Sequence, residues 1–228
     1  MYLTPPPEVS LEHKRDLLGQ AEQFVREHMA SNDPSHDYLH IERVRRMAKH
    51  LATHYELGPV DGLVVELGAL FHDMIDHKYT PEADKEPIKA QLSRLMLGNG
   101  LSPNRTALVI QIVENTGYSI ERKLREAEKW SEWHQTCPEY HCVQDADRLD
   151  AIGGIGIYRV SCYAALTNEP LYDVSNPAGT VHQHFYDKLL LIKDTLHTPK
   201  ARQVAERRQT VMEQFVRAVE IETSMADF

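Results

Sequence analysis

The sequence predicts an all-α protein that forms one helical domain over residues 1–228. Apolar residues recur at three- and four-residue spacing in successive segments of helical length. Clusters of Pro, Gly, Ser, Asn and Asp separate these segments, and no alternating pattern indicates a β-strand. A chain of 228 residues can bury a substantial core, and no repeat or low-complexity linker divides it.

Composition limits the expected partners and environment. The 25 Lys+Arg against 34 Asp+Glu give a net charge of −9, so capture of extended nucleic acid is not expected. No apolar run approaches the ~20 residues of a membrane span, so no membrane partner is expected. The three cysteines lack CxxC spacing and no signal peptide is evident, which favours reduced thiols in a cytoplasmic protein. The sequence does not fix the oligomeric state, and a homodimer is one possibility.

The first predicted helices follow from start and stop signals. Residues 1–9 form a loose N-terminal leader, and Ser10 is a suitable N-cap for an amphipathic helix that reaches Met29. After a turn cluster, Ser35 is expected to cap a second helix over residues 36–54.

The remaining helices repeat these signals. Thr80-Pro81, Ser102-Pro103 and Thr198-Pro199 each place an N-cap residue before proline, which predicts three helix starts. The charged residues 120–133 are expected to form an exposed helix or loop, and residues 181–196 a helix. A further apolar stretch is expected to bend or pack closely at its three glycines: Gly153, Gly154 and Gly156.

One segment is apolar on almost every face. Residues 64–71 have hardly any polar surface, so this helix is interior, and it delivers His72 and Asp73 at its C-terminal end. Ionisable groups there cost free energy unless they are paired, hydrogen-bonded or bound to a metal. An imidazole nitrogen beside a carboxylate oxygen can ligate one divalent ion if other segments supply further ligands.

Two other segments can supply those ligands. His36 and His40 lie four residues apart on one predicted helical face, although two solvated histidines have the same pattern. Residues 143–152 form an apolar helix interrupted by three acids, which argues against full exposure of all three: Asp145, Asp147 and Asp150.

With these segments in the order His…His-Asp…Asp, the sequence resembles the HD superfamily of metal-dependent phosphohydrolases, and most closely its small stand-alone branch. A His-x-x-x-His-x-x-Arg-Val helix over residues 36–44 precedes the apolar His-Asp helix. Residues 145–153, 184–190 and 205–208 also resemble that branch, so the resemblance extends from about residue 10 to residue 222.

By position, the resemblance places the metal ligands at His40, His72, Asp73 and Asp147. Two imidazoles and two carboxylates suit one divalent transition metal ion (Mn²⁺, Fe²⁺, Co²⁺, Ni²⁺ or Zn²⁺), with Mg²⁺ as a further candidate. The histidines between Asp73 and Asp147 lack the spacing of dinuclear members, so we expect a single ion.

The resemblance also implies roles for neighbouring residues. Asp76, about one turn after Asp73, is the candidate general base, and His77 is an alternative. Asp76 could instead be a solvent-exposed acid with no catalytic role. Arg148, next to Asp147, is the candidate catalytic cation. The candidate substrate contacts are His36, Arg43, His77, Lys78, His184, Lys188 and Arg207.

Each substrate contact has a structural alternative. Lys and Arg usually lie at the surface. Arg43 could instead pair with Glu42 or Asp37, and His184 with Phe185 could simply pack into the core.

The predicted function is that of a metal-dependent nucleotide phosphohydrolase. The resemblance favours pyrophosphohydrolysis of nucleoside triphosphates by a metal-activated water, with a small phosphorylated substrate as the partner. Two alternatives stay open: a nucleotidase or cyclic-nucleotide phosphodiesterase, and a non-catalytic helical protein that senses a metal or nucleotide. The GxGxxG, GxxxxGK and HExxH patterns are absent, which excludes Rossmann, P-loop and zincin chemistry.

Overall fold

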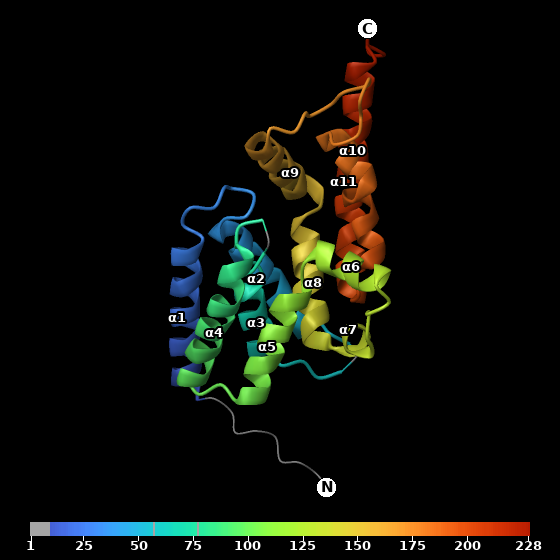
Figure 1. The fold of residues 1–228 in the computed structure, drawn as a ribbon. Coiled ribbons are helices and arrows are strands. Elements are labelled where there is room, and N and C mark those ends of the chain that lie inside the picture. The colour runs from blue at the N-terminus through green and yellow to red at the C-terminus, as the bar shows by residue number, and fades with distance from the viewer. Residues whose placement is uncertain (1–9, 57, 77) are drawn as a thin grey trace.

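The computed structural model describes residues 10–56, 58–76 and 78–228, and every regular element in these ranges is a helix. The N-terminal helices are α1 (Leu11–His28), α2 (Tyr38–Thr53), α3 (Gly62–Phe71), α4 (Glu82–Gly98), α5 (Pro103–Asn115) and α6 (Tyr118–Glu126). They are followed by α7 (Glu132–Thr136), α8 (Pro138–Asp150), α9 (Gly153–Thr167), α10 (Val181–Asp187), the 3₁₀ helix η1 (Leu189–Thr195) and α11 (Pro199–Thr223). The all-α prediction is confirmed (Figure 1). Within those ranges, none of the helices combines the length and apolar character needed to cross a membrane.

Several predicted helix starts are confirmed. The Ser10 side chain caps α1 by accepting the backbone N–H of His13 at 3.2 Å. The Thr198 side chain caps α11 in the same way, through the N–H of Ala201 at 3.2 Å. The start of α4 is displaced by one residue, because Pro81 occupies the cap position. The predicted leader, residues 1–9, lies outside the described residues.

The predicted start of the second helix is wrong. α2 begins at Tyr38, and Asp37 caps it by accepting the N–H of His40 at 3.0 Å. The Ser35 hydroxyl lies instead 2.8 Å from His36 Nδ1. Because the aspartate takes the cap, His36 lies in the turn before α2 and not on the same helical face as His40.

Two further segments differ from the prediction. Residues 181–196 do not form one helix, because the backbone leaves helical geometry at Lys188 and a 3₁₀ turn follows. Residues 120–133 contribute to α6 and α7 and are not uniformly exposed, since Glu121 is only 4% exposed.

The glycine-rich bend after α8 is confirmed. α9 starts at Gly153, whose φ of +76° is in the left-handed region that favours glycine. A Cβ at Gly156 would collide with the backbone carbonyl of Ala151. Glycine at these positions therefore lets α9 turn away from the end of α8 at close range.

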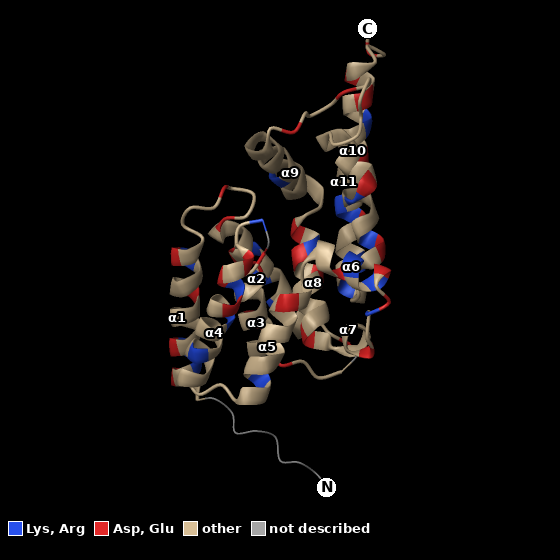
Figure 2. Cartoon of the chain, viewed as in Figure 1, with Lys and Arg blue, Asp and Glu red and all other residues tan. Residues whose placement is uncertain are grey.

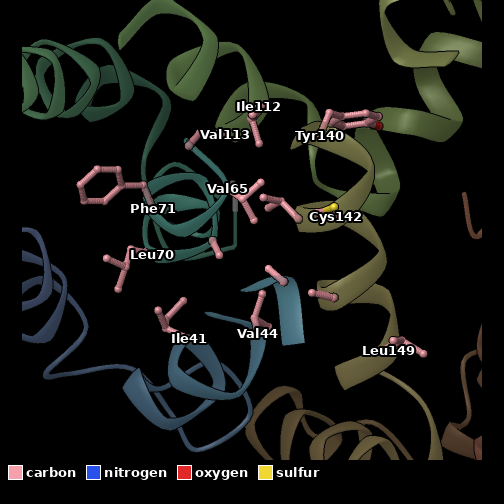
Figure 3. Close-up of a cluster of buried hydrophobic side chains, with 14 of the residues drawn as sticks. Ile41, Val44, Val65, Leu70, Phe71, Ile112, Val113, Tyr140, Cys142 and Leu149 are labelled. Carbon is pink, nitrogen blue, oxygen red and sulfur yellow. The ribbon is translucent and has the colours of Figure 1, made fainter. Parts of the chain in front are cut away.

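The core surrounds α3. Every residue from Leu63 to Phe71 is buried, and α1, α2, α5 and α8 pack around the helix (Figure 3). A Cβ at Gly68 would lie 3.2 Å from side-chain methyls of Ile112 and Val143, so glycine permits the close approach of α5 and α8. Because α3 is held on all sides, its C-terminal end is fixed relative to α2 and α8.

Candidate functional site

Two histidines meet at the C-terminal end of α3 with their ring nitrogens already oriented. His72 Nδ1 donates to the Ala69 carbonyl at 2.8 Å, and His40 Nδ1 donates to Asp150 Oδ2 at 2.7 Å. In neutral rings this leaves both Nε2 atoms as acceptors. The two Nε2 atoms nevertheless face each other at 3.2 Å, and His40 is fully buried. Burial opposes protonation of His40, but its contacts with Asp150 and Asp73 raise its pKa, so either a proton or a metal ion can lie where the two lone pairs meet.

Two carboxylates complete this cluster. Asp73 Oδ2 lies 3.3 Å from His40 Nε2, and Asp147 Oδ1 lies 3.7 Å from the Nε2 atoms of both histidines. Asp73 Oδ2 is buried and has no hydrogen-bond partner among the described residues. Burial raises the pKa of the Asp73 carboxyl, but positive charge on the neighbouring His72 and His40 rings outweighs this and holds the pKa well below its usual range. An orphaned carboxylate oxygen beside two acceptor nitrogens fits a divalent ion.

The structure therefore brings together all four predicted metal ligands. One ligand atom from each of His40, His72 and Asp73 lies within 4.8 Å of the others. Asp147 approaches the same two ring nitrogens from α8. Ligands that share an ion at about 2.1 Å lie about 3 Å or more apart, as these atoms do.

Asp150 supports this cluster from behind. Besides the His40 bond, it accepts hydrogen bonds from Arg43 Nε and Nη2, at 2.8 and 2.9 Å, and it lies 3.4 Å from Arg159 Nη1. These partners outweigh burial and hold the pKa of Asp150 far below its usual range. Its carboxylate is thus ionised and fixes the tautomer and direction of the His40 ring, as carboxylates commonly do behind metal-bound histidines. Arg43 pairs with neither Glu42 nor Asp37.

A cavity of about 240 Å³ opens over the cluster. His72, Asp73 and Asp147 contribute to its wall. So do most of the predicted catalytic and substrate contacts: His36, Asp76, Lys78, Arg148, His184 and Lys188. Arg43 and Arg207 are not brought to this cavity: Arg43 faces a different one, and Arg207 is exposed on α11. His77 lies outside the described residues.

The cavity is cationic on the side facing the carboxylates. Arg148 is buried, lies 3.2 Å from Asp147 Oδ2 and 3.4 Å from Glu121 Oε2, and leaves its Nε without a partner in the described chain. Burial, reinforced by the charges of Lys78 and Arg148, lowers the pKa of Lys188 to about 8. Both cations lie about 5 Å from the centre of the Tyr118 ring, at 5.0 and 4.9 Å.

Asp76 and His36 occupy the rim of the cavity. Asp76 is half-buried in the turn after Asp73, and its Oδ1 accepts the N–H of Lys78 at 2.8 Å. His36 Nδ1 contacts the hydroxyls of Ser35 and Tyr79, at 2.8 and 3.0 Å. Burial lowers the pKa of His36 to about 3, so the ring is neutral at pH 7.

Sequence reasoning missed four contributors to this site. Tyr118, Tyr163 and Arg159 line the cavity, and Glu121 holds Arg148 from behind. Arg159 carried a usable signal, because it is the only charged residue between Ile152 and Thr167, a segment of core character. Glu121 carried none, because it stands in a run of exposed charges.

The helical fold and the His/His/Asp cluster beneath a cationic cavity define a candidate hydrolase site, and the chain belongs to the HD domain family. The family profile matches residues 37–152, which confirms the predicted superfamily. The chain is 34% identical over 206 residues to the YpgQ protein of Bacillus subtilis, covering 89% of this chain and 93% of that protein.

Solved structures agree with this assignment. The crystal structure of Bacillus subtilis YpgQ in complex with ADP is 29% identical, covers 90% of this chain and 97% of its own, and has a TM-score of 0.70. An HD-superfamily hydrolase from Bacillus thuringiensis is 30% identical, covers 92% and 98%, and has a TM-score of 0.69.

Proposed function

We propose that this protein is a metal-dependent phosphohydrolase that converts nucleoside triphosphates to nucleoside monophosphates and pyrophosphate. The observation that carries the proposal is that the His/Asp cluster opens into a cavity with four cationic side chains: Lys78, Arg148, Arg159 and Lys188. A triphosphate needs several cations to offset its charge when it leaves water. The ADP complex of the related YpgQ supports a nucleotide as the ligand class.

The metal belongs to the proposal as well. Two imidazoles and two carboxylates favour Mn²⁺, Fe²⁺, Co²⁺, Ni²⁺ or Zn²⁺ over Mg²⁺. His40, His72, Asp73 and Asp147 would hold a divalent ion, which would lower the pKa of a bound water and polarise a phosphoryl oxygen.

The remaining chemistry falls to side chains of the cavity. Asp76, just beyond Asp73, accepts the proton of the water that attacks the α-phosphorus. As the bond from that phosphorus to the bridging oxygen breaks, the leaving pyrophosphate takes up negative charge. Arg148, Lys78 and Lys188 line the same space and stabilise that charge.

An aromatic wall gives the base a place to stack. Tyr118 and Tyr163 line the cavity. A lysine ammonium group lies near each ring: Lys188 Nζ is 4.9 Å from the Tyr118 centroid, and Lys78 Nζ is 5.2 Å from the Tyr163 centroid. A nucleotide can thus place its phosphates against the ammonium groups and its base against a ring.

The test is hydrolysis of a nucleotide panel with Mn²⁺, with products identified as phosphate, pyrophosphate or an opened cyclic phosphate. We expect pyrophosphate from nucleoside triphosphates. Asp76→Asn should lower kcat by about 100-fold or more while Mn²⁺ affinity is retained, as expected for loss of a general base. Asp84→Asn, an exposed acid on α4, is the matched control and should leave kcat unchanged.

Other products would redirect the proposal. Release of phosphate alone would indicate a nucleotidase, and opening of a cyclic nucleotide would indicate a phosphodiesterase. Protein that binds Mn²⁺ and nucleotide but turns over no substrate would indicate a sensor.

A further inference from the structure

A second cavity, of about 450 Å³, lies behind the support of the metal cluster. Its walls come from α2, the end of α8, the start of α9, and α11. Asp150 and Arg43, which hold His40 from behind, form part of this wall, whereas none of the four metal ligands does. The cavity is therefore separate from the one proposed to bind substrate.

The lining is strongly basic in an acidic protein. Arg43, Arg46, Lys200 and Arg208 contribute cations, while Asp150 is the only acid among the described residues that line the cavity. That carboxylate is already shared by His40, Arg43 and Arg159. Figure 2 shows several basic segments along α11, the helix that carries two of these cations.

Three of the cations form no ion pair in the described part of the chain, although the charge of Asp150 acts on Arg208 from a greater distance. In the described part of the chain, no carboxylate lies within ion-pair distance of Arg46, Lys200 or Arg208. Arg208 is half-buried and donates only to uncharged acceptors, the Leu149 carbonyl and the Met47 sulfur. Burial lowers the pKa of its guanidinium, so the charge is held there against a desolvation cost. An anion in the cavity would offset that cost.

Apolar side chains line the same cavity as the cations: Met47, Leu51, Leu149, Ile155 and Val204, of which Ile155 is 41% exposed. A simple inorganic anion would leave these apolar side chains in contact with water. A ligand with a charged end and an apolar body would use both kinds of side chain, which is the common pattern in small-molecule sites.

We propose that the cavity between α2, α9 and α11 is a second ligand site, which binds a small organic phosphate that carries an apolar or aromatic body. Arg46, Lys200 and Arg208 bind the phosphate, and the apolar side chains contact the body. The volume lies within the range of small-molecule sites. The proposal goes beyond the proposed hydrolysis and does not depend on it.

The test is isothermal titration of the full-length protein with α,β-methylene-ATP in EDTA, where the metal cluster cannot assist binding. Arg46→Gln with Lys200→Gln removes two cations that make no contact with the cluster. We expect this double variant to lose about tenfold or more in affinity, the equivalent of one charge-assisted hydrogen bond. The same analogue would also enter the first cavity, so Lys78→Gln with Lys188→Gln should weaken that binding event only and leave the event at the second cavity within about twofold of its wild-type affinity.

Two controls test specificity. Arg15→Gln with Arg94→Gln removes the same charge from exposed positions on α1 and α4 and should have no effect. Tripolyphosphate, which lacks an apolar body, should bind more weakly than the nucleotide analogue.

Four results would overturn the proposal. They are no binding of the analogue by wild type, loss of binding only in the Lys78/Lys188 variant, equal weakening by the Arg15/Arg94 control, and equal affinity for tripolyphosphate.

Discussion

The molecule buries two groups of histidines that differ in one respect. In the metal cluster, His40 and His72 use their Nδ1 atoms as donors, and their Nε2 atoms meet at 3.2 Å with no donor between them. In the second group, formed by His134, His141 and His197, hydrogen bonds use both ring nitrogens of His134 and His141 and the Nε2 atom of His197.

The second group can be followed bond by bond. His141 Nε2 donates to the His134 carbonyl at 2.9 Å, and its Nδ1 accepts from the Tyr55 hydroxyl at 3.2 Å. His197 stacks on His141 with centroids 4.2 Å apart and donates to Gln144 Oε1 at 2.6 Å. Burial lowers the pKa of all three rings, so they are neutral at pH 7.

The difference distinguishes histidines with a structural role from those that we propose as metal ligands. Burial is common to both groups, and so is hydrogen bonding of at least one ring nitrogen. What distinguishes the cluster is a pair of unused lone pairs beside a carboxylate oxygen that also lacks a donor.

The largest expected effect comes from Asp73→Asn. Asparagine keeps the shape of the side chain but removes one of the two negative charges among the four proposed ligands. Mn²⁺ affinity should therefore fall by more than about 100-fold, which is more than mutation of a residue that hydrogen-bonds a ligand usually costs. Titration calorimetry of the folded variant measures this. Undiminished Mn²⁺ binding would show that the cluster is not the metal site.

Asp150→Asn tests the support of the cluster. Losing the carboxylate removes the acceptor that orients His40 and leaves Arg43 without its partner, so Mn²⁺ affinity should fall by about 10–100-fold. Asp145→Asn is the matched control in the same helix, because its carboxylate accepts the backbone N–H groups of His197 and Thr198. That control should lose stability and keep its metal affinity.

Lys188 makes substrate capture pH-dependent. Its pKa of about 8 means that the ammonium form is present at pH 7 and is lost as the pH rises through 8. If that charge binds phosphate, kcat/KM should fall by about tenfold per pH unit above 8. Lys188→Arg, which stays charged, should move that decline to higher pH. A profile that is the same in both proteins would remove Lys188 from the substrate site.

The smallest effect on the metal is expected from the second group. His141→Gln breaks its bonds to Tyr55 and His134 and should lower the free energy of unfolding by about 1–3 kcal/mol. Mn²⁺ affinity should stay as in wild type. Chemical denaturation and Mn²⁺ titration of one preparation measure the stability and the metal affinity of the variant. Weaker Mn²⁺ binding would show that the second histidine group also contributes to the metal site.

The parts of the molecule that were predictable are those encoded locally. Ser10 and Thr198 cap their helices through bonds three residues away, and the apolar helix before His72 has no alternative to the interior. Each of these features depends on a few neighbouring residues, so the sequence pattern suffices to indicate it.

What escaped prediction depends on contacts between distant segments. Arg43 pairs with Asp150 and not with an acid nearby in sequence, and Glu121 is buried because Arg148 and Gln144 reach it from α8. Local pattern also could not choose between Asp37 and Ser35 as the cap of α2, since both residue types accept such bonds. Tertiary packing decides each of these cases.

The sequence separation within the metal centre has a thermodynamic consequence. His40 and Asp150 lie 110 residues apart, and the ligands come from α2, the end of α3 and α8. An unfolded chain cannot hold these groups together, so an ion bound here is linked to folding and acts as a reversible cross-link. Free metal at 100 times its Kd adds about 2.7 kcal/mol to the free energy of unfolding. In a chain of this size, a chelator should then lower Tm by roughly 5–11 °C. Metal supply would thus set how long the folded protein persists as well as whether it can act.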